Sequence, residues 1–261
     1  KKKSAIFRLQ EHVDRLFNSA IVLGIEIPFA KKKIFNTILQ VVRENKLEEC
    51  YIRPIVFLGH NQMGLNPNGV DVRVAIAAWP WGAYLGDEGI NKGIRVRVSS
   101  FTRHHVNISL TRAKACGYYI NSILAKAEAV RDGYDEAILL DPQGYVSEGS
   151  GENIFLLSKG RLKTPDLSCS NLEGITRDSV LDICKHLKIK VEEGHMTRDE
   201  LYIADEVFLT GTAAEITPVR EIDGRTIGSG KRGKVTASIQ KMFFEIVRGK
   251  HTKFKKWLAE V

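Results

Sequence analysis

The spacing of apolar residues along the chain predicts helices first and strands after them. In residues 9–23 apolar side chains recur every three to four positions, which is typical of an amphipathic helix, and a second helix is predicted over 32–45. The following segments are rich in β-branched residues, and the last of them alternates apolar and polar positions, so strands are predicted at 51–58, 70–79 and 94–100. This part of the chain is therefore predicted to be an α+β module.

Three glycines between two predicted strands mark a domain boundary. The segment 82–92 reads GAYLGDEGINK, and glycine-rich stretches of this kind are typical of hinges. We predict a small N-terminal domain over 1–86, a linker over 87–92 and a larger domain over 93–261. In the larger domain the same patterns predict helices at 112–132, 176–187 and 235–248, and strands at 137–140, 154–158, 207–210 and 215–222.

Composition and charge exclude several classes of protein. The 261 residues are 43% hydrophobic and 27% charged, as in globular proteins, and no stretch approaches the roughly 20 apolar residues of a membrane helix. The net charge of +8 is spread over short lysine and arginine runs without interleaved aromatic residues. We therefore expect neither a membrane nor a nucleic-acid partner.

The four cysteines, Cys50, Cys116, Cys169 and Cys184, stand far apart in the sequence. They form neither a Cys-x-x-Cys pair nor the spacing of a zinc site, so no metal site is predicted from them. Free thiols fit a reducing compartment, which indicates a cytoplasmic location.

Polar or glycine-rich residues border predicted apolar elements in four distant segments. The segments are TRAKACGYY (111–119), YVSEGSGENIF (145–155), LEGITRD (172–178) and TGTAAEITP (210–218). Taken singly, three of these segments have ordinary explanations: a surface lysine for the first, a turn between two strands for the second and the end of a strand for the last. Their combination carries the functional signal.

Together these segments resemble the fold-type IV pyridoxal-phosphate enzymes, and most closely the branched-chain aminotransferases. The resemblance runs from Phe7 to Leu258 and includes YIRPIVF (51–57), AAWPWGAYLG (77–86) and GYDEAILLD (133–141). It implies a two-domain fold of mixed α+β and α/β class, like that of D-amino acid aminotransferase. A small N-terminal α+β domain would precede a larger C-terminal domain with a pseudo-barrel sheet.

The resemblance implies a transaminase with pyridoxal 5'-phosphate as cofactor. Such an enzyme transfers the amino group between leucine, isoleucine or valine and 2-oxoglutarate, yielding 2-oxo acids and glutamate, and Lys114 would bind the cofactor as a Schiff base. The pyridine nitrogen of the cofactor must stay protonated to accept electrons, which requires an adjacent carboxylate. By resemblance this residue is Glu148.

The resemblance also assigns the remaining contacts of the cofactor. Its phosphate would bind at a helix N-terminus to Ile175 and Thr176, where backbone N–H groups and the helix dipole favour an anion. Thr212 and Arg15 would complete the phosphate site. Tyr119 would hydrogen-bond the phenolic oxygen.

Two further residues near the cofactor are implied. Leu172 would pack on the ring face of the cofactor. Glu152 would stabilise Arg15 or the cofactor indirectly, through the residues that contact them.

Five residues are implied for the substrate. The family holds the α-carboxylate near the backbone of Thr212 and Ala213, and Trp81 and Tyr84 match the aromatic wall around an apolar side chain. Arg53 matches the arginine that binds the distal carboxylate of glutamate. An arginine beside aromatic residues would serve both substrates in turn.

The chain departs from the family pattern at several positions. Tyr118 stands where an asparagine is usual, and Glu173 replaces a frequent proline. The N-terminal family segment with its histidine-tyrosine-glycine motif has no counterpart before Lys1, so we expect the given chain to begin inside the protein.

Alternatives also remain open. A D-amino acid transaminase or an aminodeoxychorismate lyase shares the lysine and the glutamate, and a truncated, catalytically impaired remnant is a third hypothesis. Family members assemble from two or more subunits, so at least a homodimer is expected.

Overall fold

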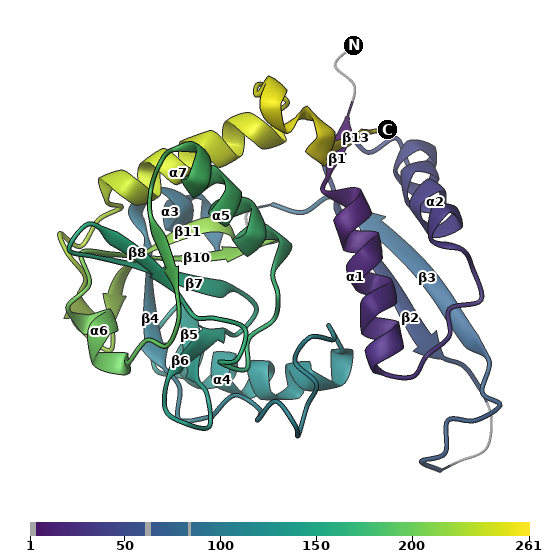
Figure 1. Cartoon of the computed structure of the whole chain (residues 1–261), viewed down its shortest axis with the longest axis horizontal. Coiled ribbons are helices and arrows are strands. Elements are labelled where there is room, and N and C mark those ends of the chain that lie inside the picture. The colour runs from purple at the N-terminus through teal and green to yellow at the C-terminus, as the bar shows by residue number, and fades with distance from the viewer. Residues whose placement is uncertain (1–3, 61–63, 83–84) are drawn as a thin grey trace. The chain divides into compact units, whose positions relative to one another are not determined.

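A computed structural model describes residues 4–60, 64–82 and 85–261 and divides the chain into two compact units (Figure 1). The first unit combines Lys1–Gly82 with Gly249–Val261, and the second is Ala83–Arg248. The last residues of the chain thus belong to the same unit as the first, whereas the sequence had assigned them to the larger domain.

Residues 87–92, predicted to be a linker, lie in helix α3 (Gly86–Lys92) of the second unit. The glycine at position 89 serves close packing, because a Cβ atom there would lie 3.0 Å from Cγ2 of Ile94. Helix α7 (Lys234–Val247) also holds α3, because the side chain of Gln240 donates a hydrogen bond to the carbonyl of Ile90 (3.0 Å). These residues therefore form a helix, and the prediction that they are an irregular linker is wrong.

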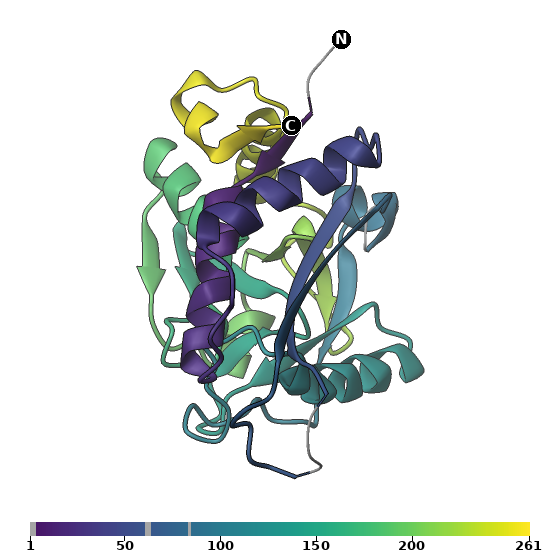
Figure 2. The ribbon, with the colours of Figure 1, turned by 90° about the vertical axis from the view of Figure 1, so that its right-hand side faces the viewer.

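Two helices and a β-hairpin form the body of the first unit. Helices α1 (Leu9–Val22) and α2 (Lys31–Glu44) pack against the antiparallel strands β2 (Tyr51–Leu58) and β3 (Val72–Trp79), as Figure 2 shows. Their apolar stripes meet in a core that consists of Leu9, Val13, Ile34 and Ile38 with Ile52, Val74 and Ile76 around it. The helical and alternating patterns of the sequence thus correspond to the buried faces.

A short antiparallel pair joins the two chain ends within the first unit. Strand β1 (Ala5–Phe7) pairs with β13 (Leu258–Glu260), which follows the 3₁₀ helix η2 (Thr252–Trp257). Trp257 packs against Phe254 (ring centroids 4.5 Å apart) and Phe7 (5.8 Å). These strands of three residues were not predicted, because so short a segment has no readable periodicity.

The second unit is built on a mixed sheet whose order is β6-β5-β4-β11-β10-β7-β8-β9 in the described part of the chain. Its strands are β4 (Ile94–Val98), β5 (Glu136–Leu140), β6 (Val146–Gly149), β7 (Asn153–Ser158), β8 (Arg161–Thr164), β9 (Val191–Glu193), β10 (Glu206–Gly211) and β11 (Glu215–Ile222), with β12 (Arg225–Thr226) paired to β11. Strand β4 runs parallel to both β5 and β11, and β8 runs parallel to β9. The other pairings are antiparallel.

Helices lie along this sheet and carry residues to its edges. They are η1 (Cys116–Tyr118), α4 (Tyr119–Arg131), α5 (Ile175–His186), α6 (Arg198–Tyr202) and α7 (Lys234–Val247), with α5 beside α7 in Figure 1. The helix predicted from residue 112 begins only at Tyr119, because Ala115 has an extended backbone (φ −83°, ψ 137°) and only a 3₁₀ turn, which contains Gly117, lies between them. Lys114 therefore precedes the helix. Among the described helices, none has both the length and the apolar character to cross a membrane.

Candidate active site

The amine of Lys114 lies beside a phenol. Lys114 is exposed in the loop before η1, and Tyr119 is the half-buried first residue of α4. One helical turn between the two brings Nζ of Lys114 to 2.6 Å from the hydroxyl of Tyr119. The structure thus brings together two residues that the sequence predicted for the cofactor.

Glu148 is a buried carboxylate with three hydrogen-bonding neighbours. It lies in β6 with 5% of its surface exposed, and its oxygens accept from Arg103 Nη2 (2.8 Å), the backbone N–H of Leu172 (3.1 Å) and Asn153 Nδ2 (3.4 Å). Burial raises the pKa of Glu148, while the charges of Arg103 and Lys114 lower it. Lys114 and Glu148 are therefore close enough to interact electrostatically.

The residues around Glu148 were expected to form a turn, but the first of them are strand. Val146–Gly149 is β6, in which Glu148 pairs with Leu139 of β5. The glycines misled the prediction, because Gly149 approaches other groups closely: a Cβ atom there would lie 2.8 Å from Glu152 Oε2 and 3.2 Å from its carbonyl oxygen. The strand holds the Glu148 carboxylate more rigidly than a turn would.

Arg103 was not predicted, although it forms the ion pair with Glu148. It lies in the loop after β4, and its backbone N–H donates to the carbonyl of Leu140 (2.8 Å) while Nη1 donates to Ser122 Oγ (3.2 Å). Its side chain is 12% exposed. The available signal was indirect: a buried carboxylate requires a positive partner, so one of the arginines before Lys114 was a candidate.

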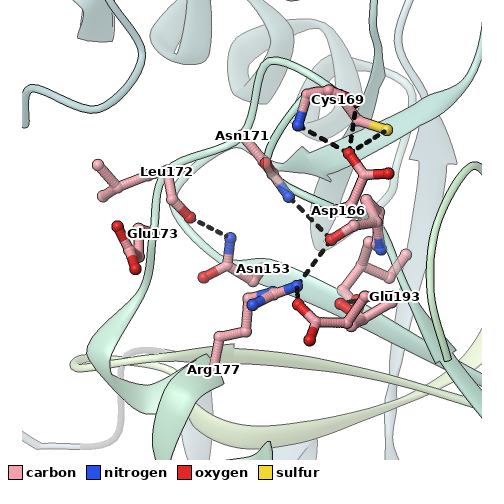
Figure 3. A network of polar contacts seen from close by, with 12 residues as sticks. Asn153, Asp166, Cys169, Asn171, Leu172, Glu173, Arg177 and Glu193 are labelled. Atoms are coloured by element: carbon pink, nitrogen blue, oxygen red, sulfur yellow. Dashed lines mark hydrogen bonds and ion pairs between the residues drawn. The ribbon is translucent and has the colours of Figure 1, made fainter. Parts of the chain in front are cut away.

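A network of polar contacts surrounds the loop before α5 and includes Asn153, Leu172 and Arg177 (Figure 3). Asn153 donates to the carbonyl of Leu172 (2.8 Å) as well as to Glu148. Arg177 of α5 donates to the carbonyl of Pro165 (2.9 Å) and to Glu193 (2.7 Å), as the dashed lines in Figure 3 show. The loop before α5 is therefore held from both of its ends.

The N-terminus of α5 presents backbone donors. Gly174 is its N-cap, and no side chain caps the first turn, which contains the buried residues Ile175 and Thr176. A Cβ atom on Gly174 would lie 1.9 Å from Asn153 Oδ1, so only glycine fits between the network and the helix. This end of a helix is suited to bind an anion.

A tight turn between β10 and β11 holds Thr212 and Ala213. Thr212 is exposed and Ala213 half-buried, and Glu215 closes the turn with a positive φ of 52°. Just before the turn, the hydroxyl of Thr210 is buried and has no partner among the described residues. Beside it, burial and the charge of Glu136 raise the pKa of Glu152.

The first unit contains the other predicted residues. Arg53 in β2 lies over the rings of Tyr51 (5.4 Å) and Trp79 (5.5 Å), and Trp81 packs on both rings with centroid distances of 4.6 and 5.5 Å. Arg15 is half-buried on α1. Tyr84 lies outside the described residues.

Two departures from the expected pattern have local partners. The hydroxyl of Tyr118 accepts from the backbone N–H of Leu110 (3.2 Å), so it braces the loop that leads to Lys114. Glu173 forms an ion pair with Arg112 (2.9 Å). Both substituted residues thus connect the lysine loop to its surroundings.

Comparisons with known proteins agree on one family. The model of the family described as amino-transferase class IV matches residues 2–222. The branched-chain-amino-acid aminotransferase of Pseudomonas aeruginosa is 55% identical over 97% of this chain and 82% of its own length. The corresponding enzyme of Escherichia coli K12 is 45% identical over all of this chain and 84% of its own.

Solved structures give the same result for the fold. The crystal structure of the Escherichia coli branched-chain amino acid aminotransferase has a TM-score of 0.96 at 45% identity, covering 98% of this chain and 84% of that one. The T.th. enzyme with pyridoxamine 5'-phosphate has a TM-score of 0.95 at 49% identity, covering 99% and 85%. The same T.th. enzyme has also been solved with N-(5'-phosphopyridoxyl)-L-glutamate and with 4-methylvaleric acid, each at a TM-score of 0.92 and 47% identity, covering 98% and 83%, and 99% and 84%, respectively.

Proposed function

The chain belongs to the branched-chain amino acid aminotransferases of the amino-transferase class IV family, and from this premise we propose roles for its individual residues. The fold-type IV architecture predicted from the sequence is confirmed, and so are the transaminase activity and the cofactor pyridoxal phosphate. The proposal concerns which side chains perform this activity. One observation carries it: the amine of Lys114 donates to the hydroxyl of Tyr119, and its charge acts on the buried carboxylate of Glu148.

The donor set of the second unit fits this cofactor. The cofactor has an aldehyde, a ring nitrogen that takes up a proton, a phenolic oxygen and a phosphate. The unit offers an amine, a buried carboxylate, a phenol and an uncapped helix N-terminus. When bound, pyridoxal phosphate supplies a protonated ring that accepts electron density from the substrate α-carbon.

Lys114 is proposed as the catalytic residue. Its Nζ atom is a nucleophile for the cofactor and then carries a proton to and from the substrate α-carbon. The hydroxyl of Tyr119, 2.6 Å away, orients this amine. Since α4 begins at Tyr119, the helix fixes the phenol relative to the lysine loop.

Glu148 is proposed to hold the proton on the ring nitrogen, and Arg103 to keep Glu148 charged. The carboxylate has to be ionised for this role, and burial alone opposes ionisation. The ion pair with Arg103 and the N–H of Leu172 offset part of that effect, although the pKa of Glu148 remains above its ordinary value. Arg103 therefore acts as a positioning residue through Glu148.

Backbone and hydroxyl donors are proposed for the two anionic groups. The N–H groups of Ile175 and Thr176 would bind the cofactor phosphate together with Thr212, and Arg15 would add its charge. Leu172 would pack on the ring. The backbone of Thr212 and Ala213 would bind the substrate α-carboxylate. All of these are group types that bind anions in other proteins.

The first unit is proposed to select the substrate side chain. Arg53 lies over Tyr51 and Trp79, so its guanidinium already rests on aromatic faces and its distal nitrogens can bind the second carboxylate of glutamate. Trp81, with Tyr84, would contact leucine, isoleucine or valine. The T.th. enzyme complexes with a glutamate adduct and with 4-methylvaleric acid support this pairing of substrates.

We further propose the context in which the chain works. Its substrates are small molecules. The protein would assemble at least as a homodimer and would have neither nucleic-acid nor membrane partners. All four cysteines are free thiols in the structure, which supports a reducing, cytoplasmic location. The small domain is proposed to be the first unit, which also includes Gly249–Val261, and the large domain is proposed to be the second unit.

Replacement of Lys114 tests the proposed function. Lys114→Ala should abolish transfer from leucine to 2-oxoglutarate and the absorbance band of the lysine-linked cofactor, because the amine that forms the link is removed. Lys92→Ala is the matched control, since the Lys92 side chain is 71% exposed in the same unit and pairs with Glu88, whose side chain is also exposed. An active Lys114→Ala protein, or one that keeps the band, would refute the assignment.

A further inference from the structure

Three side chains outside the proposed active site lie together with different donor atoms. Asp166, Cys169 and His195 offer an oxygen, a sulfur and a nitrogen, all within 4.8 Å of one another. Asp166 and Cys169 lie in the loop after β8, and His195 lies between β9 and α6. The sequence predicted no metal site, because its cysteine spacing could not reveal ligands from two separate loops.

The loop holds the first two donors on the same side. The N–H of Cys169 donates to the carbonyl of Asp166 (3.2 Å), and the N–H of Ser168 donates to Asp166 Oδ1 (2.7 Å). This turn brings the Cys169 sulfur to 4.0 Å from Asp166 Oδ1, and Figure 3 shows the two pointing toward each other. The donors are thus arranged before any ligand arrives.

The third donor is held by an aromatic contact. The ring of His195 stacks on Tyr145, with centroids 4.4 Å apart and planes inclined by 29°. Nε2 of His195 lies 3.4 Å from the hydroxyl of Ser168, on the same turn as the other donors. His195 is exposed, so solvent reaches this side of the cluster.

The surrounding charges favour a cation. The carboxylates of Asp166 and Asp141 both act electrostatically on the sulfur of Cys169. Such negative charges attract a divalent ion, which displaces the thiol proton when it binds. The nearby guanidinium of Arg177 donates to Pro165 and Glu193, so it does not occupy the cluster.

We propose that Asp166, Cys169 and His195 form a zinc site, with water as the fourth ligand. Mixed sulfur, nitrogen and oxygen donors are typical of zinc, whereas calcium and magnesium require mainly oxygen ligands. The ion would connect the loop before α5 to the segment before α6. Since the same loop continues to Leu172, whose N–H binds Glu148, zinc would stiffen the segment that supports the active-site carboxylate.

Cobalt titration of the cofactor-loaded protein tests this proposal. Co²⁺ should bind one ion per chain with a sulfur-to-cobalt absorption band, and Zn²⁺ should displace it. Cys169→Ser should remove the band, and His195→Gln, at an exposed position, should weaken Co²⁺ binding by at least about tenfold because one of three protein ligands is lost.

Two matched variants serve as controls. Cys50→Ser removes a thiol of the other unit, and His186→Gln removes an exposed histidine of α5. Both should bind cobalt like the parent protein. Absence of the band in the parent protein, or unchanged binding in His195→Gln, would overturn the zinc site.

Discussion

At the scale of single residues, the protonation state of Glu148 depends on two opposing effects, burial of the carboxylate and the positive charge beside it. Burial raises its pKa, and the guanidinium of Arg103 at 2.8 Å offsets part of this increase, so the pKa stays above its ordinary value. A group whose pKa is raised by burial stays neutral to higher pH, and only the neighbouring charge restores the ionised form. The activity at neutral pH should therefore depend on Arg103 although the proposal gives it no contact with the substrate.

Arg103→Met should shift the pH dependence of the reaction. Without the guanidinium the pKa of Glu148 rises further, so the required carboxylate forms only at higher pH. The acid limb of kcat/KM should therefore move upward by about one pH unit or more, with at least a tenfold loss below it. Loss of one partner of a buried pair should also cost about 3–5 kcal/mol of stability. Steady-state kinetics over pH and denaturant titration measure both effects.

Two related variants separate charge from structure. Arg103→Lys keeps the positive charge and should return the acid limb toward that of the parent protein. Arg131→Met removes an arginine whose side chain is 75% exposed and should change neither measurement. An acid limb that stays in place in Arg103→Met would assign Arg103 a purely structural part.

At the scale of elements, the end of β4 is fastened to α4 by one carboxylate. Glu128 of α4 accepts from Ser99 Oγ (2.6 Å), from the N–H of Ser100 (2.9 Å) and from Ser100 Oγ (2.5 Å). Burial raises the pKa of Glu128, but these hydrogen bonds outweigh it and lower the pKa from 4.5 to about 2. Because α4 carries Tyr119, this contact also positions the phenol beside Lys114.

Glu128→Gln should lower the free energy of unfolding by about 1–3 kcal/mol at neutral pH, since charge-assisted hydrogen bonds are lost. The folded pKa lies below the ordinary value, so the contribution of Glu128 is complete above pH 4.5 and disappears as the pH falls toward 2. The difference between parent and variant should shrink over that range. Chemical denaturation at several pH values measures it.

Glu88→Gln is the control for this effect. Glu88 also pairs with a cation, Lys92, but its side chain is 83% exposed, and solvent-exposed pairs contribute little. The free energy of unfolding of the Glu88→Gln variant should equal that of the parent protein at every pH. A Glu128→Gln variant that behaves in the same way would contradict the role of Glu128.

The close fit between α5 and the network of Figure 3 gives a second prediction at this scale. In Gly174→Ala the new Cβ would lie 1.9 Å from Asn153 Oδ1, so Asn153 or the helix start has to shift. Because Asn153 also holds Leu172 and Glu148, cofactor affinity should fall by about tenfold or more. Equilibrium titration with pyridoxal phosphate measures this loss.

Gly194→Ala is the matched control for this substitution. A Cβ atom there would meet nothing within 4 Å, so cofactor affinity should be unchanged. Equal affinity in both variants would show that the space around Gly174 does not matter for the cofactor.

At the scale of the whole molecule, the first unit is completed by the end of the chain. Strand β13 pairs with β1, and Trp257 lies under Arg8, whose guanidinium is 4.6 Å from its ring centroid. The backbone N–H of Arg8 also donates to the carbonyl of Trp257 (2.6 Å). A substitution near the C-terminus should therefore act on the N-terminal unit.

Trp257→Ala should destabilise that unit by about 3–5 kcal/mol, because a large buried aromatic side chain is lost. All three tryptophans of the chain, Trp79, Trp81 and Trp257, lie in the first unit, so the fluorescence of the two that remain reports its unfolding. The denaturation midpoint measured by this fluorescence should therefore be lower than in the parent protein. Leu65→Ala, at a fully exposed position of the same unit, should leave the midpoint unchanged, and an equal midpoint in Trp257→Ala would contradict this placement.

The long periodic elements and the residues of local motifs could be predicted from the sequence. Helices α1 and α2 and strands β2 and β11 lie within two residues of their predicted bounds. The roles of Lys114, Glu148 and Thr176 were predicted because their segments resemble the motifs of a known family, and they stay predictions. Family, activity and cofactor followed from these motifs, and the comparisons confirm them.

Only the tertiary structure decided which distant groups share an environment. Arg103 reaches Glu148 because the loop after β4 lies near β6, two strands along the sheet, and nothing in the sequence specifies that order. In the same way, β1 becomes a strand through β13, and His195 meets Cys169 through the loops beyond β8 and β9. Periodicity along the chain reports which face of an element is buried, whereas the partner on that face depends on long-range packing. The sequence by itself therefore determined the family, the cofactor and the main helices and strands. The fold determined which distant residues pair, and such pairs control the charge of groups like Glu148.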